Sequence, residues 1–498
     1  MGESWLKMNI SGESVSAIFI IVLVSLFILS NFAVGFILPL FILVMVPAFF
    51  IAVFYPRSGI YAIIFLTIIF ERFFTLQTIL IGKGEYKLYP IDIILGAVII
   101  GTIFEIISGQ RGPTSLTQNG QKRSNLFKFK KADGYLIGFI FFVTIYFFVT
   151  TFIFKSDFSL AFSSFKNYVF YSLLYFLVLF LENEEEYIKR LFNFFLAGAI
   201  AIIAFIIYGL AARHGLWSDF THLSTDGIRT LAFTHAFYLS MGFLTLLTYY
   251  IVQEKKYISG TGLVLLIIWS IGIIGSMMRH LWAGLGISVF ILYFLLSEKQ
   301  RTYFGKMFFN YLSILMLVGV LIFYLSAIFP YSGFSRATDS TQTVIEKRVG
   351  SVFAASQDES FSWRNMVWNE GMKEYLQKPV FGLGLGQRIY VESEGYRDFV
   401  EVRNIHNSLL VLLFQFGLIP FILFALFVFN NARNICLKKA KDWIDISLII
   451  LLTNYLVLFI FQPYLETNML GIFFWIILGL IAVRSRKVEL AIIPKVQL

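Results

Sequence analysis

Long apolar runs separated by short polar segments dominate the chain. The first run, from Val15 to Tyr55, contains no charged residue. A helix that crosses a bilayer needs about 20 apolar residues, so this run is long enough for two helices with a break between Asn31 and Gly35. The pattern predicts an all-α polytopic membrane protein.

The same criterion along the whole chain predicts fourteen spans, or twelve if the short third, sixth and tenth do not all cross the membrane. The spans are expected at Val15–Ser30, Gly35–Phe54, Gly59–Phe74, Ile91–Ile107, Tyr135–Phe154, Lys166–Leu181, Leu191–Leu210, Leu231–Val252, Gly260–Ser276, Leu281–Leu296, Phe308–Pro330, His406–Phe429, Trp443–Phe461 and Thr467–Val483.

Lysine and arginine concentrate in three loops, Ser108–Gly134, Ser297–Met307 and Asn430–Asp442, and in the tail from Arg484. Loops rich in these residues stay in the cytoplasm. All four segments fall on the same side of the membrane if the chain crosses it fourteen times. The sequence therefore predicts a multi-pass protein of the plasma (inner) membrane with both termini in the cytoplasm.

Composition agrees with this assignment. Hydrophobic residues make up 58% of the chain and charged residues 14%, whereas soluble domains carry about 25% charged residues. The formal charge of +10 needs no nucleic-acid partner, because basic loops facing anionic membrane lipids account for it. The single cysteine, Cys436, excludes an internal disulfide. No cleavable signal-peptide pattern is found, so we expect the first helix to be the first span.

One predicted extracytoplasmic loop, residues 331–405, is much longer than the others and mixes acidic with basic residues. Its stretch "WRNMVWNEGMKEYLQKP" predicts an amphipathic helix with Trp363, Val367 and Trp368 near one face, ended by Pro379. No repeat and no second soluble domain is found, so we expect a single membrane domain over residues 1–498.

Three features could carry chemistry. Arg279 stands at a predicted helix junction and offers a planar cation for phosphate oxygens, although a snorkelling arginine would look the same. Gly382, Gly384 and Gly386 alternate after Pro379, as in a flexible turn or a bend against substrate. His406, at the start of a span, could act as a general base or lie at the interface as a hydrated histidine.

Several motifs are absent from the sequence. No Walker motif, D-x-D, H-E-x-x-H or G-x-S-x-G occurs. We therefore expect no cofactor, no metal and no ATP, and any reaction would have to use an already activated substrate.

Together, "SMMRHLW", "WRNMVWNEGMKEYLQKPVFGLGLGQ" and "HNSLLVLLFQFGLIPF" resemble the O-antigen ligase and O-antigen polymerase superfamily over residues 275–421. Two positions depart from the family pattern: Gln415 stands where many members have an acidic residue, and His280 where a small residue is common. The family motif residues match Arg279, Arg364, Pro379, Gly382, Gly384, Gly386, His406, Asn407 and Gly417.

The resemblance implies an inverting-type membrane glycosyltransferase that is independent of metal ions. Such enzymes transfer a saccharide from a polyprenyl pyrophosphate to an acceptor hydroxyl at the extracytoplasmic face. It implies catalytic roles for His406, Arg279 and Arg364. Its partners would be a lipid-linked oligosaccharide, an acceptor glycan or lipid, and membrane lipids, and a chain-length regulator stays open. The expected substrate-binding residues are Arg213, Arg229, Arg388, Gly382, Gly384, Gly386 and Asn407.

Three functions stay open at this point. A polymerase would join lipid-linked repeats, and a ligase would move the glycan onto a lipid or protein acceptor; we favour the polymerase. A transporter is the alternative from another class, but no internal repeat is found. A metal-dependent oligosaccharyltransferase is disfavoured. Such enzymes need acidic residues in the first outer loop, and here that loop, Asn31–Val34, contains none.

Overall fold

The computed structural model describes residues 11–70, 77–81, 84–108, 129–181, 184–212, 231–254, 259–328, 359–393 and 396–492. The chain divides into two compact units. Unit 1 comprises residues 1–198, 366–439 and 459–498, and unit 2 comprises residues 199–365 and 440–458. The prediction of one membrane domain over residues 1–498 stays a prediction.

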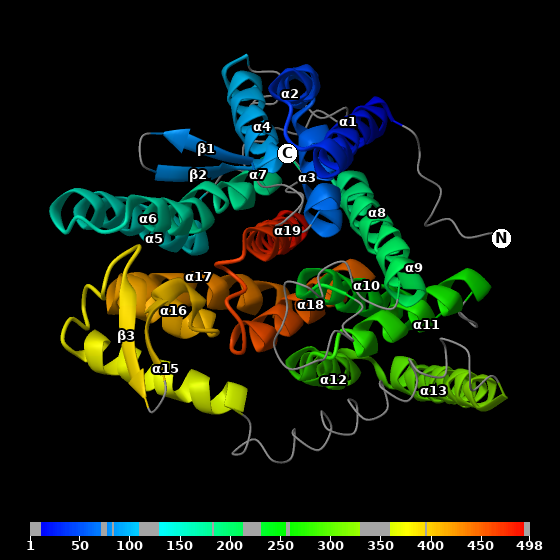
Figure 1. Cartoon of the computed structure of the whole chain (residues 1–498). Helices are drawn as coiled ribbons and strands as arrows, with labels where there is room; N and C mark the ends of the chain where they lie inside the picture. Colours follow the sequence, from blue (N-terminus) through cyan, green and yellow to red (C-terminus); the bar gives the residue numbers. More distant parts are fainter. Residues whose placement is uncertain are drawn as a thin grey trace. The chain divides into compact units, whose positions relative to one another are not determined.

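Helices form nearly all the regular structure in the described residues (Figure 1). Unit 1 holds α1 (Gly12–Val34), α2 (Leu38–Phe54), α3 (Pro56–Ile69), β1 (Gln77–Ile81), β2 (Gly84–Leu88), α4 (Pro90–Ile107), α5 (Lys131–Phe148), α6 (Phe158–Phe165), α7 (Leu173–Leu181), most of α8 (Glu185–Ala201), most of α15 (Glu359–Leu376), β3 (Arg388–Ser393), β4 (Tyr396–Glu401), α16 (Ser408–Phe416), α17 (Leu418–Cys436) and α19 (Asn468–Ile492). Unit 2 holds α9 (Ile203–Ala212), α10 (Phe233–Val252), α11 (Gly260–Gly275), α12 (Arg279–Leu295), α13 (Glu298–Ile328) and nearly all of α18 (Trp443–Phe459).

The helices confirm the predicted fold class. In the described part of the chain, 9 helices are long and apolar enough to cross a membrane, and five shorter apolar helices accompany them. Each of the fourteen predicted spans falls on one of these helices. The amphipathic helix predicted in the long loop is also present, as α15.

Some predicted boundaries are wrong. The predicted loop Ser297–Met307 is helical, because α13 begins at Glu298. The sixth span begins at Phe158 rather than at Lys166, because a π-helical segment, Lys166–Phe170, carries the polar residues within the continuing helix. The span from His406 is broken at Gly417 into α16 and α17. The two antiparallel hairpins, β1–β2 and β3–β4, were not predicted.

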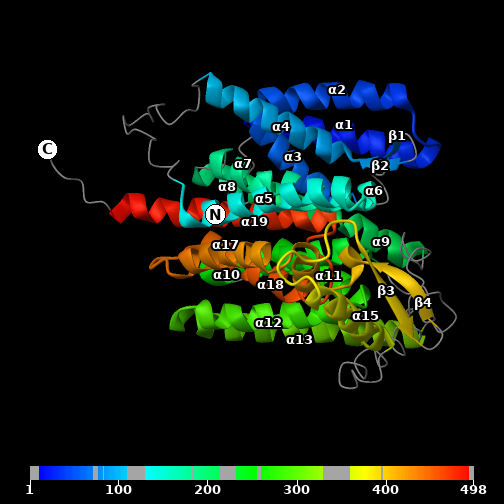
Figure 2. The same ribbon diagram turned by 90° about the vertical axis from the view of Figure 1, so that its left-hand side faces the viewer.

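Helix α19 forms the centre of unit 1. It packs against α3, α7 and α17 (Figure 1). In its most apolar stretch of 18 residues, 94% of the residues are buried. Both hairpins lie at the same end of the unit 1 helices (Figure 2). We call the end of the unit 1 helices where both hairpins lie, together with the loops there, the hairpin end.

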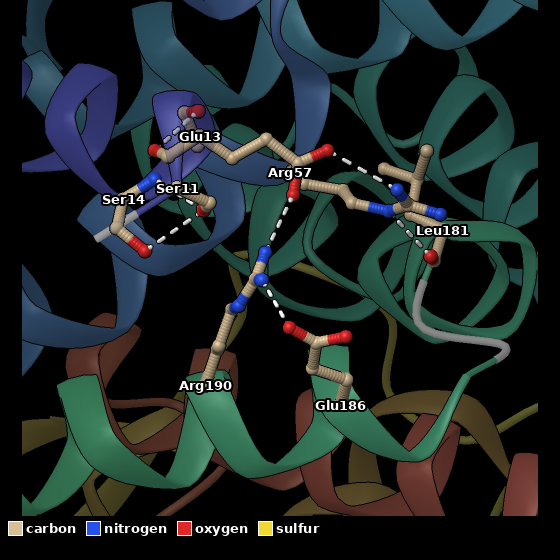
Figure 3. A network of polar contacts seen from close by, with 8 residues as sticks. Ser11, Glu13, Ser14, Arg57, Leu181, Glu186 and Arg190 are labelled. Carbon is tan, nitrogen blue, oxygen red and sulfur yellow. Dashed lines mark hydrogen bonds and ion pairs between the residues drawn. The ribbon is translucent and has the colours of Figure 1, made fainter. Parts of the chain in front are cut away.

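A charged network joins residues near the starts of α1, α3 and α8 (Figure 3). The Glu13 carboxylate lies 3.1 Å from Arg57 and 3.4 Å from Arg190. Arg57 also donates to the Leu181 carbonyl at 2.9 Å, and Arg190 pairs with Glu186. Arg57 is 4% exposed, so its carboxylate partner is needed to offset the loss of hydration. The network ties α1, α3 and α8 together.

Candidate active site

The glycine segment that follows α15 packs against the break between α16 and α17. A helix leaves its last carbonyls without helical partners. The amides of Leu383 and Gly384 donate to the carbonyls of Phe414 and Gln415, at 2.7 and 3.0 Å. On the other side of the break, the Leu418 amide donates to the Pro379 carbonyl at 3.0 Å. The segment thus satisfies backbone groups that the helix break exposes.

All three predicted turn glycines adopt positive φ angles, of +69° at Gly382, +104° at Gly384 and +74° at Gly386. An added Cβ would lie 2.6 Å from the Phe414 carbonyl oxygen at Gly382 and 2.6 Å from Thr150 Cγ2 at Gly384. These glycines therefore allow close approach to other parts of the protein. Their predicted role in binding substrate stays a prediction.

Helix α15 is anchored on the segment that leads to His406. Val367 is fully buried, and the Trp368 indole donates to the Ile405 carbonyl at 2.7 Å. The Tyr375 ring stacks on Phe414 in α16. Val367, Trp368 and Tyr375 of the predicted apolar face thus pack within unit 1 and fix the backbone immediately before the histidine.

His406 has a φ of +57°, which is uncommon for a residue other than glycine. Such strained positions cluster at functional sites. Its Nδ1 lies 2.7 Å from Oε1 of Gln462. An amide oxygen can only accept, so this contact favours the neutral tautomer with its proton on Nδ1 and its lone pair on Nε2. This is the tautomer that a general base acting through Nε2 requires.

A carboxyl group lies beside this histidine segment, between α18 and α19. Glu466 accepts a hydrogen bond from Ser408 at 2.6 Å and another from Tyr168. The backbone carbonyl of Glu466 accepts a hydrogen bond from the side-chain amide of Asn167 at 2.6 Å. Although part of the residue stays at the surface, burial of the carboxyl raises the pKa of Glu466 to about 7, against the lowering effects of both hydroxyls and of Arg403.

The π-helical segment beside Glu466 also holds a buried ion pair. Lys166 lies 2.8 Å from Asp92, whose other oxygen accepts from Tyr171 at 2.6 Å. The Lys166 ammonium also lies 4.3 Å from the centre of the Tyr89 ring. π-Helical segments are frequent at functional sites, and this one presents Lys166 to the Asp92 carboxyl group and Tyr168 to the Glu466 carboxyl group.

Two further arginines lie at the hairpin end. Arg403 donates to Glu401 at 2.7 Å and to the Ser163 hydroxyl at 2.8 Å. Arg388 begins β3 and lies 3.7 Å from Asp157 in an exposed ion pair, so its predicted contact with substrate would have to compete with this partner.

Asn407 is 7% exposed and caps α16, where its side chain accepts from the Leu410 amide at 3.1 Å. This bond gives Asn407 a helix-capping role. The predicted contact of Asn407 with substrate stays a prediction.

The predicted catalytic arginines both lie in unit 2. Arg279 is the first residue of α12 and half-buried, and Arg364 lies half-buried in α15. The amino end of a helix carries positive partial charge, so the helix does not stabilise the charge of an arginine there. The helix end and the arginine together favour a bound anion. Arg213 and Arg229 lie outside the described residues.

The structure brings Gln462, Glu466 and Arg403 into this region, and none of them was singled out from the sequence. Glu466 carried a usable signal: it is an acidic residue in a short segment between two apolar spans, and ionisable residues near a membrane tend to be functional. Gln462 carried no such signal, because amides are common in loops. Within the described ranges, no three His, Cys, Asp or Glu residues are grouped to hold a metal ion.

Replacing Glu466 with glutamine should change how stability depends on pH. A carboxyl whose pKa is raised by folding binds its proton more tightly in the folded state, so stability falls as the pH rises from about 5 to about 8. Glu466→Gln removes this titration. Over that range, its free energy of unfolding should rise relative to that of wild type by about 2 kcal/mol, after discounting for partial exposure. Thermal unfolding in detergent across this pH range measures the difference.

Glu392→Gln is the matched control, because Glu392 lies in an exposed pair with Arg397 on the same unit. Parallel pH dependence of wild type and Glu466→Gln would contradict the burial of this carboxyl.

Comparison with known proteins identifies the region that carries these motifs. Residues 262–425 match the family model described as O-antigen ligase. The matched range contains the predicted motif region, residues 275–421. No curated protein matches the chain. The family match confirms the resemblance derived from the arginine, glycine and histidine motifs.

Proposed function

We propose, from the match of residues 262–425 to the O-antigen ligase family, that the protein transfers a saccharide from a polyprenyl pyrophosphate to an acceptor hydroxyl. The family match supports a membrane enzyme of the ligase or polymerase type. Of these two, we propose the polymerase, which joins one lipid-linked repeat to another.

In the proposed reaction the acceptor oxygen attacks the anomeric carbon of the donor sugar. The bond from that carbon to the phosphate oxygen breaks, and the polyprenyl pyrophosphate leaves with the electron pair. The acceptor proton passes to Nε2 of His406. Attack from the face opposite the leaving group inverts the anomeric centre. The donor carries its own activation, so the proposal includes no nucleotide and no metal ion.

The observation that carries the proposal is the hydrogen bond between His406 and Gln462, 2.7 Å long. A base that accepts the acceptor proton at Nε2 must keep its own proton on Nδ1, and the amide oxygen of Gln462 favours that tautomer. A general base contributes about 10²–10⁴-fold to a reaction of this kind.

We assign the leaving group to Arg279 and Arg364. The pyrophosphate gains negative charge as the bond to the sugar breaks, and a preorganised guanidinium stabilises that charge. The position of Arg279 at the amino end of α12 supports this role, because the helix amides add to the attraction for an anion.

Arg279→Lys tests whether the planar fork matters. Lysine keeps the charge but loses the paired donors that match phosphate oxygens. We expect turnover to fall by about tenfold or more, with the protein still folded. Initial rates of transfer with purified protein measure this.

The matched control is Arg301→Lys. Arg301 belongs to the same unit and donates to the Tyr293 carbonyl at 3.1 Å, and it has no assigned role in the reaction. Equal rates for Arg279→Lys and wild type would remove Arg279 from the mechanism.

For the location, we propose the plasma (inner) membrane, with both termini in the cytoplasm and the hairpin end at the extracytoplasmic face. The distribution of lysine and arginine in the sequence supports this orientation. Lipid-linked glycan would then reach His406 from the outer leaflet.

A reconstitution assay tests the proposed function. Purified protein is given one defined lipid-linked repeat unit, and the products are separated on a gel. A ladder of longer lipid-linked glycans establishes a polymerase, and transfer only after a foreign acceptor is added establishes a ligase. Folded protein that transfers nothing to any acceptor would overturn the proposal and leave the transporter as the alternative.

A further inference from the structure

The segment between α18 and α19, residues 460–467, forms a compact turn at the hairpin end. The Tyr464 amide donates to the Gln462 carbonyl at 2.9 Å, and the Thr467 amide donates to the Pro463 carbonyl at 3.1 Å. Tyr464 and Leu465 are each 1% exposed. The turn is therefore held by its own backbone and by buried side chains, and Gln462 projects from a fixed base.

The turn is also bonded to the segment that carries His406. Ser408, two residues after the histidine, donates to Glu466 at 2.6 Å, and its hydroxyl oxygen accepts from the Leu465 amide at 3.3 Å. Tyr168 donates to the second oxygen of Glu466. Glu466 thus joins the turn to the start of α16 and to the π-helical segment, and these bonds limit movement of Gln462 relative to His406.

Gln462 is well suited to fix the state of the imidazole. Neutral histidine exchanges its proton between two ring nitrogens, and the hydrogen bond at one nitrogen decides which form prevails. The contact of 2.7 Å between Nδ1 and the Gln462 oxygen favours the proton on Nδ1. Because an amide is uncharged, it does this without adding a negative charge that would raise the pKa of the imidazole.

We propose that Gln462 is a positioning residue of the transfer reaction, which holds His406 in the tautomer whose Nε2 accepts the proton, and that Glu466 anchors the turn that presents Gln462. The inference rests on the proposed function, in which His406 is the base. Tyr168 and Arg403 interact with the Glu466 carboxyl that anchors the turn.

Two substitutions at Gln462 separate positioning from a general structural role. Gln462→Leu keeps much of the volume but removes the acceptor, so the tautomer preference is lost and kcat should fall by about tenfold with little change in KM. Gln462→Glu keeps the acceptor and adds a charge. It should retain kcat at alkaline pH, and it should move the acidic limb of the kcat/KM profile upward by about one pH unit, because a carboxylate stabilises the imidazolium.

Gln377→Leu is the matched control. Gln377 is exposed just beyond α15 in the same unit, and the change of side chain is identical. We expect it to leave kcat and the pH profile unchanged.

A second measurement does not depend on activity. The chain has 5 histidines, and selective ¹⁵N labelling of histidine reports the tautomer of each ring, with His406 assigned by the signal that His406→Asn removes. At alkaline pH the wild type and Gln462→Glu should show the proton of His406 on Nδ1, and Gln462→Leu should show a mixture or the other tautomer.

The outcomes separate the inference from the proposed function. If His406→Asn transfers saccharide as fast as wild type, the proposed base fails, and the role of Gln462 fails with it. If His406→Asn is inactive but Gln462→Leu keeps wild-type kcat and the Nδ1 proton, only the inference is overturned. It is also overturned if Gln462→Leu and Gln462→Glu lose activity equally and neither changes the pH profile or the tautomer. The expected loss, the pH shift and the tautomer change together support it.

Discussion

Replacing His406 with alanine should reduce turnover by about 10²–10⁴-fold, the contribution of a general base. The acceptor hydroxyl would then have to lose its proton to water, while the arginines assigned to the pyrophosphate would still act. We therefore expect the affinity for the lipid-linked donor to change little. Initial rates of transfer and equilibrium binding of the donor measure the two effects separately.

His406→Asn provides the control for folding. Asparagine tolerates positive φ angles better than most residues, and the φ of +57° at this position makes that tolerance relevant. The asparagine variant should unfold at nearly the wild-type temperature and still be inactive. Turnover within about twofold of wild type in either variant would remove His406 from the mechanism.

Gly417→Ala should strongly destabilise unit 1. Gly417 has a φ of +79°, and an added Cβ would lie 2.2 Å from the Val380 carbonyl oxygen. With a ψ of −175°, this backbone conformation is open essentially to glycine alone and costs other residues about 1–3 kcal/mol, and overpacking adds about 1–3 kcal/mol. We expect a total of about 2–6 kcal/mol, seen as a lower midpoint of thermal unfolding in detergent, together with loss of activity.

Gly96→Ala is the matched control, because Gly96 lies within α4 of the same unit and an added Cβ meets nothing within 4 Å. Alanine is favoured over glycine in helices by about 1 kcal/mol, so this variant should be as stable as wild type or slightly more stable. Equal midpoints for Gly417→Ala and Gly96→Ala would contradict the packing of the glycine segment against the α16–α17 break.

The fold class could be predicted from the sequence because a bilayer imposes a simple requirement. A spanning helix needs a long apolar stretch, and such stretches stand out as clearly in α10 as in α19. The predicted ends were less accurate. Charged residues at the start of α13 resembled a loop, although a helix can extend beyond the apolar segment with its polar residues still satisfied.

The site could be predicted only in part. His406 and the glycines stand in recognisable motifs, and the structure gives both a positive φ. The partner of His406 could not be predicted, because Gln462 is 56 residues away in the chain and meets the histidine only through the packing around α19. The glycine segment was expected either as a flexible turn with close backbone approach or as a bend against substrate. Its backbone amides bond to the α16–α17 break, and a contact with substrate stays a prediction.

In the proposed reaction, the protein forms a glycosidic bond with the polyprenyl pyrophosphate as leaving group. The most direct measurement counts the polyprenyl pyrophosphate released and the glycosidic bonds formed by purified protein, in the presence of a chelator and without nucleotide. We expect one molecule released for each bond formed, and the loss of both in His406→Ala. Release without bond formation, or bond formation that requires an added metal ion or nucleotide, would contradict it.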